Sequence, residues 1–289
     1  MSAPFIEVSY FPGCSLATTA RESNQSLVES CEMMGLKLIE LDDWNCCGSS
    51  SAHALDMKLA YSLGARILSL AEPDRPLLVM CPACFKNLLS SRNHLHSHPV
   101  FRRAQERKWG RAINPELNIF SFLEILQFLD RLGAMGVAPV MEFSRKLSNL
   151  KIAPYYGCMA MFPSSLKQHR VSYDLLEKRS SGLGAELVRW AHGHRCCGTF
   201  LSVTKVDIAT LVVNEIMHGA IDAGAECLVT ACAMCQLNLE IRSTLKNSIP
   251  ILHFSEILAL ALGAKDYQPW FSRHLVDPSP LLKEKGIIT

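Results

Sequence analysis

The sequence lacks any long apolar run and any strong excess of one charge. None of its apolar stretches reaches the ~18 residues that a membrane-spanning helix needs. Residues 1–14 also lack the basic start and apolar stretch of a secretory signal peptide. The formal net charge is only +2, and no basic patch interleaved with aromatic residues indicates nucleic-acid binding. We therefore expect a cytoplasmic protein with no membrane span and no nucleic-acid partner.

Two motifs of redox proteins are missing as well. The sequence contains no G-x-G-x-x-G fingerprint of a dinucleotide-binding domain. It also contains no C-x2-C-x2-C-x3-C-P run of the kind found in bacterial ferredoxins. If the protein takes part in electron transfer, its electrons must therefore come from another subunit.

Cysteine is abundant, with 12 among 289 residues. Ten of the twelve belong to one pattern that occurs twice. The pattern is a lone cysteine, followed by a Cys-Cys pair and then by a C-x-x-C motif. The first set comprises Cys14, Cys46, Cys47, Cys81 and Cys84, and the second comprises Cys158, Cys196, Cys197, Cys232 and Cys235. The copies also share a glycine before the lone cysteine, a glycine after the pair, and an asparagine three residues after the C-x-x-C. This agreement indicates an internal duplication.

Five thiols delivered by three separated segments suit ligands around one inorganic centre better than a disulfide framework. In a reducing cytosol, thiols are kept reduced, so this density of cysteine indicates metal, clusters or redox chemistry. A structural zinc site and an ordinary cubane iron–sulfur cluster each take four protein ligands. The fifth thiol therefore favours an unusual iron–sulfur cluster or one reactive cysteine. Two zinc sites or a dithiol relay are the alternatives.

Short β-rich apolar runs precede the cysteine groups, and segments with helical periodicity lie between them. The predicted strands are residues 5–10, 36–41, 77–80, 152–156, 186–190 and 227–230, and the clearest helices are residues 54–70 and 206–223. Alternating strands and helices predict an α/β fold with a small, mainly parallel sheet and flanking helices in each half. The cysteines would then lie at the carboxyl ends of the strands, where open α/β sheets bind their ligands.

A fourth strand and helix close each half, because residues 118–124 echo residues 250–256. Residues 131–149, which contain two glycines and a proline, are the predicted linker. We therefore expect two pseudo-symmetric domains, at residues 1–135 and 150–265. Residues 266–289 are expected to form an extended carboxyl-terminal tail that lies on another subunit or across the protein's own surface.

The cysteine pattern resembles that of the CCG (cysteine-rich domain) family. Residues 11–14 (FPGC), 45–48 (NCCG) and 235–239 (CQLNL) are similar to the B subunit of heterodisulfide reductase and its bacterial heterodisulfide-reductase-like homologues. The resemblance covers nearly the whole chain. It implies that each set of five cysteines holds one noncubane 4Fe-4S cluster, and that a disulfide substrate binds between the two clusters. Substrate sulfur would bind at cluster iron, and no protein residue is assigned as the acid or base.

The resemblance also implies a heterodisulfide-reductase-type complex with two further subunits, one that contains flavin and one that is ferredoxin-like. The substrate would be a small thiol or disulfide, such as the coenzyme M–coenzyme B disulfide, or a protein-bound sulfur carrier. The direction of the reaction depends on reduction potentials. The alternative is an electron-transfer or anchoring subunit, like the CCG subunits of succinate-, lactate- or glycolate-oxidising complexes. Two complete cysteine sets favour the two-electron sulfur chemistry.

Several other residues invite a functional interpretation. Cys31 and Cys227 have no counterpart in the other copy, so we expect both to be buried core residues. His192, His194 and Arg195 precede the second Cys-Cys pair, where they would tune or protonate a cluster-bound sulfur or be loop residues without a ligand role.

Two polar tracts lie outside the cysteine pattern. His94, His96 and His98 alternate in what we expect to be a solvated loop rather than a metal site. The densest basic run is expected to be a charged helix face, with docking of a partner or attraction of an anionic substrate as the alternative. This run comprises Arg102, Arg103, Arg107, Lys108 and Arg111.

Overall fold

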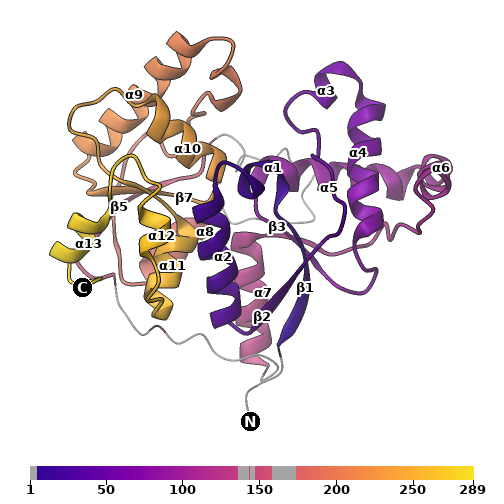
Figure 1. Cartoon of the computed structure of the whole chain (residues 1–289), viewed down its shortest axis with the longest axis horizontal. Helices are drawn as coiled ribbons and strands as arrows, with labels where there is room; N and C mark the ends of the chain where they lie inside the picture. The colour runs from indigo at the N-terminus through magenta and orange to yellow at the C-terminus, as the bar shows by residue number, and fades with distance from the viewer. Residues whose placement is uncertain (1–4, 136–142, 144–146, 158–173) are drawn as a thin grey trace. The chain divides into compact units, whose positions relative to one another are not determined.

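The computed structural model describes residues 5–135, 143, 147–157 and 174–289. The chain forms two compact units, and each contains one four-stranded sheet (Figure 1). Of the described residues, the first unit holds 5–17 and 35–135, and the second holds 18–34, 143, 147–157 and 174–289.

The first unit is built on a sheet with the strand order β2-β1-β3-β4, in which every neighbouring pair is parallel. Its strands are β1 (Ile6–Phe11), β2 (Leu36–Glu40), β3 (Leu77–Val79) and β4 (Ile119–Ser121). Its helices are α1 (Gly13–Ala17), α3 (Ala52–Leu55), α4 (Met57–Leu70), α5 (Pro82–Ser97), α6 (Pro99–Trp109) and α7 (Phe122–Ala134). All three residues of β3 are buried, as expected of a parallel strand covered on both faces.

The second unit repeats this sheet with the order β6-β5-β7-β8, again all parallel. Its strands are β5 (Lys151–Tyr155), β6 (Glu186–Leu187), β7 (Cys227–Thr230) and β8 (Ile251–His253). Its α-helices are α2 (Arg21–Met33), α8 (Leu175–Gly182), α9 (Val206–Asp222), α10 (Ala233–Arg242), α11 (Phe254–Leu262), α12 (Gln268–Phe271) and α13 (Ser279–Glu284). A short 3-10 turn, η3 (Thr199–Leu201), precedes α9.

The matching strand orders confirm the predicted α/β fold with two parallel sheets. Four of the six predicted strands differ from the observed ones by one residue at one or both ends, and β7 has the predicted bounds. The exception is residues 186–190, of which only Glu186 and Leu187 form a strand. Beyond them the Trp190 indole N–H donates to the Pro154 carbonyl at 3.0 Å. The helix predicted over residues 54–70 is divided by Asp56, whose side chain accepts a hydrogen bond from the Lys58 N–H and caps α4.

The sequence echo between residues 118–124 and 250–256 has a structural cause. In each unit the last strand runs directly into a helix that begins with a reciprocal capping box. Ser121 pairs with Glu124 at the start of α7, and His253 pairs with Glu256 at the start of α11. Each glutamate accepts the N–H of the residue three positions before it, at 2.8 and 2.7 Å. The two segments therefore have similar sequences because each forms the same capping box at a strand-to-helix junction.

Helix α2 lies in the first half of the sequence but packs in the second unit, against α11 and α12. Three buried serines on α2 make the contact polar. Ser23 donates to the Gln236 side chain at 2.9 Å, and the hydroxyls of Ser26 and Ser255 lie 2.6 Å apart. Ser30 donates to the Ser255 carbonyl at 3.0 Å. A helix with few large apolar residues is thus held by paired hydrogen bonds.

The predicted linker, residues 131–149, begins inside α7, which continues to Ala134. Residues 136–142 and 144–146 of it lie outside the described residues. The predicted extended tail is wrong, because residues 266–289 contain α12 and α13. Trp270, Phe271 and Leu282 are buried, so this segment belongs to the hydrophobic core of the second unit.

The predicted histidine loop is also wrong. His94 and His96 lie in α5, and His98 is its C-cap. The His94 ring stacks on Tyr61 with centroids 4.0 Å apart and on His98 at 4.1 Å. A buried face with Leu88, Leu89 and Leu95 continues the helix through this polar tract. The tract is therefore one side of an amphipathic helix.

Candidate functional site

The first set of cysteines lies beyond the carboxyl ends of three neighbouring strands. Cys14 is in α1, directly after β1, and Cys46 and Cys47 lie in the loop after β2. Cys81 is the N-cap residue of α5, directly after β3, and Cys84 is in the first turn of that helix. Because carboxyl ends of parallel strands meet at one edge of a sheet, three distant segments come together there.

The sulfurs of the first set form close pairs. The Cys46 and Cys14 Sγ atoms are 4.0 Å apart, and those of Cys47 and Cys84 are 3.0 Å apart. Cys14 and Cys46 are exposed, whereas the other three thiols are buried. The set thus has a buried side formed by the helix α5 cysteines and an open side formed by Cys14 and Cys46.

The second set has the same placement in the second unit. Cys196 and Cys197 lie in the loop after β6, Cys232 is the N-cap of α10, and Cys235 follows within its first turn. The Cys197 and Cys235 Sγ atoms are 3.5 Å apart. Cys196 is exposed and the other three are buried. Cys158, the lone cysteine of this set, lies outside the described residues.

Glycines and asparagines that match between the copies support both sets. The N–H groups of Gly48 and Gly198 approach the Cys46 and Cys196 sulfurs at 3.5 and 3.4 Å. Asn87 donates to the Cys47 carbonyl at 2.5 Å, and Asn238 donates to the Cys197 carbonyl at 2.8 Å. The non-cysteine positions shared by the copies therefore fix the loops that carry the sulfurs.

The glycine before each lone cysteine is required by both backbone and space. Gly13 and Gly157 have φ values of +74° and +65°, which side chains other than hydrogen rarely tolerate. A Cβ atom at Gly13 would lie 3.2 Å from the Cys84 sulfur, and one at Gly157 would lie 3.0 Å from the Cys235 sulfur. These glycines bring the backbone close to the buried sulfurs.

Hydrogen bonds between thiols divide the protons unequally. Contacts with Cys46 and Cys84 lower the pKa of Cys47, and the contact with Cys235 lowers the pKa of Cys197. The same contacts raise the pKa values of Cys46, Cys84 and Cys235. The contact with Cys84 also lowers the pKa of Cys81. The contacts between thiols therefore favour the thiolate, the form that binds metal, at Cys47, Cys81 and Cys197.

The eleven described cysteines are all free thiols. The cysteine sulfurs of the two sets therefore suit an inorganic group that is bound by several thiolates. Within the described ranges, no three His, Cys, Asp or Glu side chains gather as ligands of a single metal ion do. The sulfurs of the first set lie instead as two close pairs, Cys14 with Cys46 and Cys47 with Cys84.

Cys31 and Cys227 stand apart from the two sets. Cys31 lies in α2 and Cys227 begins β7, and both are fully buried. Burial raises the pKa of each thiol well above its usual value. The prediction that both are core residues is confirmed.

The residues before the second Cys-Cys pair have structural contacts. His192 packs over Gly219 of α9, and the His194 ring stacks on Tyr156 with centroids 5.1 Å apart. Arg195 forms an ion pair with Glu215. A tuning role for His192, His194 and Arg195 stays a prediction.

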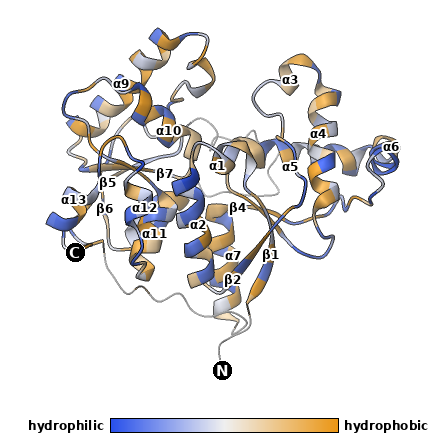
Figure 2. Ribbon diagram, in the orientation of Figure 1, coloured by the Kyte–Doolittle hydropathy of each residue, from blue (hydrophilic) through white to orange (hydrophobic). Residues whose placement is uncertain are grey.

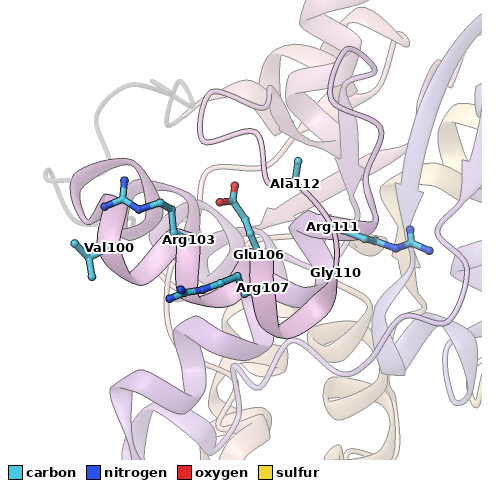
Figure 3. A pocket seen from close by; sticks show the side chains of 7 residues that line it. All are labelled: Val100, Arg103, Glu106, Arg107, Gly110, Arg111 and Ala112. Carbon is cyan, nitrogen blue, oxygen red and sulfur yellow. The ribbon is translucent and has the colours of Figure 1, made fainter.

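The basic run lies on and just after α6, which is mostly hydrophilic (Figure 2). Arg102 lies 3.9 Å from Glu106, and the Lys108 ammonium lies 4.5 Å from the centre of the Trp109 ring. A hollow of about 670 Å³ lies beside this helix, and Figure 3 shows the side chains that line it. It is lined by Val100, Arg103, Glu106, Arg107, Gly110, Arg111 and Ala112. The expected charged helix face is confirmed, and the docking role stays a prediction.

Sequence reasoning missed Tyr155. Its side chain packs in one buried cluster with Cys197, Cys232 and Cys235, and its hydroxyl donates to the Arg195 carbonyl at 2.5 Å. Superposing the copies on their lone cysteines aligns Tyr155 with Phe11. The difference between tyrosine and phenylalanine at this position was the sequence signal that could have identified Tyr155.

Two copies of a parallel α/β unit, each presenting cysteines at the carboxyl edge of its sheet, define a duplicated cysteine-rich α/β protein. The sequence model of the family described as CCG, cysteine-rich domain, matches residues 8–88 and 152–240. The chain belongs to this family.

Curated relatives span nearly the whole chain. The 8-methylmenaquinol:fumarate reductase membrane anchor subunit of Wolinella succinogenes is 28% identical over 95% of this chain and 99% of its own. The B subunit of the ferredoxin:CoB-CoM heterodisulfide reductase of Methanosarcina mazei is 26% identical over 82% of this chain and 84% of its own. No helix within the described ranges is long and apolar enough to cross a membrane.

Among solved structures, a hypothetical protein from Helicobacter pylori has the same fold. It superposes with a TM-score of 0.72 at 15% identity and covers 94% of this chain. The chain spans about half of that structure's length, at 52%.

Proposed function

We propose that this protein is an iron–sulfur redox subunit of a multi-subunit oxidoreductase. The observation that carries the proposal is the duplicated cysteine set, which occupies the same edge of two equivalent sheets. The relatives named as the B subunit of heterodisulfide reductase and as a fumarate reductase subunit support membership of a redox complex. The chain supplies thiolates and takes its electrons from another subunit.

In the finer form of the proposal, each set of five thiols holds one noncubane 4Fe-4S cluster. The first set is Cys14, Cys46, Cys47, Cys81 and Cys84, and the second is Cys158, Cys196, Cys197, Cys232 and Cys235. Such clusters supply one-electron transfer and iron that binds sulfur. Structural zinc would use four ligands, which leaves the fifth thiol of each set without a role.

The reaction proposed is the cleavage or formation of a disulfide. Cleavage of R–S–S–R′ consumes two electrons and two protons and releases RSH and R′SH. One electron would pass at each set, which would explain why the chain carries two sets of cysteines. In this proposal substrate sulfur would enter from the side of the exposed thiols, which are Cys14 and Cys46 in the first set and Cys196 in the second. The buried thiols at the start of α5 and α10 would hold the centre from the opposite side.

The proposed partners are the flavin-containing and the ferredoxin-like subunits of a heterodisulfide-reductase-type complex in the cytoplasm. The substrate class is a small thiol or disulfide, or a protein-bound sulfur carrier. The relatives from Methanosarcina support this choice, because their names specify a CoB-CoM heterodisulfide.

A second candidate is an electron-transfer or anchoring subunit of a complex that interconverts fumarate and succinate, or of a related lactate or glycolate oxidising complex. It is favoured by the Wolinella relative, which matches at 28% identity over almost the whole length of both chains. In that case the two sets would pass electrons without binding substrate sulfur.

Low-temperature EPR of the anaerobically loaded protein separates the two candidates. The spectra are recorded after oxidation, with and without added coenzyme M, coenzyme B or a simple alkyl thiol. Disulfide chemistry predicts a paramagnetic signal that changes when thiol is added, because thiol sulfur binds at the centre. A signal that ignores every thiol would favour the relay.

A further inference from the structure

Helix α6 is an addition to the first copy of the repeated unit. In each unit the chain runs from the C-x-x-C to the last strand of the sheet. Ile119, which begins β4, follows Cys84 by 35 residues, whereas Ile251, which begins β8, follows Cys235 by only 16. The added length holds the end of α5 and all of α6. Residues 236–250, all of them described, complete the same sheet order without such a helix, so the fold does not require α6.

This added helix concentrates positive charge. Residues 99–111 contain five cationic side chains and one carboxylate, on a chain whose net charge is only +2. The carboxylate, Glu106, already has partners, since it lies 3.9 Å from Arg102 and accepts the Ile113 N–H at 3.1 Å. The other arginines of the run are exposed and form no ion pair within the described part of the chain. They are Arg103, Arg107 and Arg111, and we call them the basic face of α6.

The basic face has a mixed charge pattern. Arg103 and Arg107 are one turn apart, about 6 Å along the helix axis, and Figure 3 shows both extending to the same side of Glu106. Arg111, beyond the end of the helix, extends in the opposite direction. All four side chains line the hollow beside α6. A carboxylate therefore lies between the cations.

This pattern favours a protein partner over other anions. Sites for small ligands are usually enclosed and largely apolar, whereas the guanidinium groups here are exposed. Nucleic acid or an anionic lipid surface would bring phosphate groups against the Glu106 carboxylate. A protein surface that is mainly acidic can present carboxylates to the arginines and a cation or a hydrogen-bond donor to Glu106. The charges of the basic face are therefore complementary to such a surface.

The end of α6 adjoins the loop that carries the first Cys-Cys pair. Trp109 is the last residue of α6, and the Arg66 guanidinium lies 5.6 Å from the centre of its ring. Arg66 donates to the Asp43 carbonyl at 2.7 Å and to the Asn45 side-chain oxygen at 2.8 Å. Asn45 directly precedes Cys46, whose thiol is exposed. A partner docked on α6 would therefore lie beside the open side of the first cysteine set.

We propose that the basic face of α6 is the docking surface for an acidic face of the subunit that delivers electrons, so that electrons enter at the first cysteine set. This inference rests on the proposed function and names the surface that would meet the ferredoxin-like partner. In each transfer the reduced iron–sulfur partner loses one electron and the first centre gains it. Opposite charges on the two proteins accelerate their encounter and orient it.

The test uses a small acidic ferredoxin as the probe and the full-length protein loaded with iron and sulfide. Binding of fluorescently labelled ferredoxin is measured by anisotropy at low and high ionic strength, and reduction by ferredoxin is followed by stopped flow. The double variant Arg103→Gln/Arg107→Gln removes two charges from the basic face. Lys246→Gln/Lys265→Gln is the matched control, because it removes two exposed charges from the second unit. Reduced methyl viologen, a small cation, serves as a donor that needs no basic surface.

We expect the arginine variant to weaken ferredoxin binding and to slow reduction by ferredoxin about tenfold at low ionic strength. The difference should largely disappear at high salt, and methyl viologen should reduce wild type and both variants at the same rate. The lysine control should behave as wild type with both donors.

Equal ferredoxin binding and equal reduction rates in the arginine variant and the lysine control would overturn the inference. Unchanged ferredoxin binding with loss of binding to pyrophosphate or to phosphatidylserine vesicles would also overturn it, because the face would then serve a small anion or a lipid surface. Protein that takes up no iron and sulfide would defeat the proposed function. If the arginine variant of that protein still lost ferredoxin binding, the docking surface alone would be supported.

Discussion

A buried ion triad in the second unit allows one prediction to be worked out in detail. His274, in the carboxyl-terminal segment, lies between two glutamates. Its Nδ1 is 2.6 Å from Glu240 on α10, and its Nε2 is 2.8 Å from Glu256 on α11. The three side chains are 1%, 6% and 0% exposed. We predict that His274→Gln strongly destabilises the second unit, because it leaves two buried carboxylates without a cation.

The size of the effect follows from burial and from the pKa of the histidine. Burial opposes the charged form, but Glu256 and Glu240 outweigh it and raise the pKa of His274 from 6.5 to about 11. A rise of that size corresponds to an upper limit of roughly 6 kcal/mol, at 1.36 kcal/mol for each pKa unit. Removing one partner of a buried ion pair generally costs about 3–5 kcal/mol. We expect a loss in the free energy of unfolding within the latter range near neutral pH.

The pH dependence has a definite sign. A group whose pKa is raised in the folded state stabilises it fully below the unfolded pKa, here 6.5, and loses that contribution as pH rises toward 11. The difference in stability between wild type and His274→Gln should therefore shrink by about 1.4 kcal/mol for each pH unit between 7 and 9. Glu22 and Arg273 also face this region, and both are retained in the variant.

Urea unfolding of the full chain, followed by circular dichroism at pH 7, 8 and 9, measures this difference. His253→Gln is the matched control. Burial lowers the pKa of His253 to about 4, so that side chain is neutral in both states above pH 7. Its replacement should cost the same free energy at all three pH values. A His274→Gln deficit that does not change with pH would refute the assignment of His274 as a buried cation.

The remaining predictions concern the cysteine sets. Gly157→Ala should cost about 1 kcal/mol from its positive φ alone, and should lower iron content because the new Cβ would crowd the nearby thiol. Cys47→Ser and Cys197→Ser should each remove about half of the iron and leave circular dichroism largely unchanged; loss of all iron from either would argue against two independent centres. Cys31→Ala and Cys227→Ala should keep the full iron content, and a missing centre in either would mean that the set of five ligands is misassigned.

Much of the fold was predictable because the signals are local and repeated. Apolar runs before each cysteine group predict strands, and a turn chemistry that appears twice, such as the capping boxes at Ser121 and His253, predicts equivalent junctions. Duplication gave each prediction an internal check. The cysteine groups themselves could be placed because the carboxyl ends of parallel strands converge.

The position of α2 was not predictable in the same way. Its polar residues Ser23, Ser26 and Ser30 indicate an exposed face. All three are nevertheless buried, and they form hydrogen bonds with residues more than 200 positions away in the sequence. Such pairing depends on tertiary contacts that no local pattern contains. The carboxyl-terminal segment was misjudged for a related reason, since His274 is an internal cation only in the presence of its two glutamates.

The candidate site, like the fold, could be predicted only in part from the sequence. Sulfur spacing identified the two sets, whereas the donors around the sulfurs were visible only in three dimensions. Tyr155 ends β5 and packs in one buried cluster with Cys197 and Cys235, a relation that spans 80 residues of sequence. A comparison of the copies residue by residue would have singled out Tyr155 against Phe11, but would not have shown which sulfur it meets.

Iron and acid-labile sulfide analysis of anaerobically purified full-length protein tests the central claim most directly. Two 4Fe-4S centres predict about eight iron and eight sulfide for each chain. Zinc without sulfide would contradict the account, because it would reduce the two cysteine sets to structural metal sites.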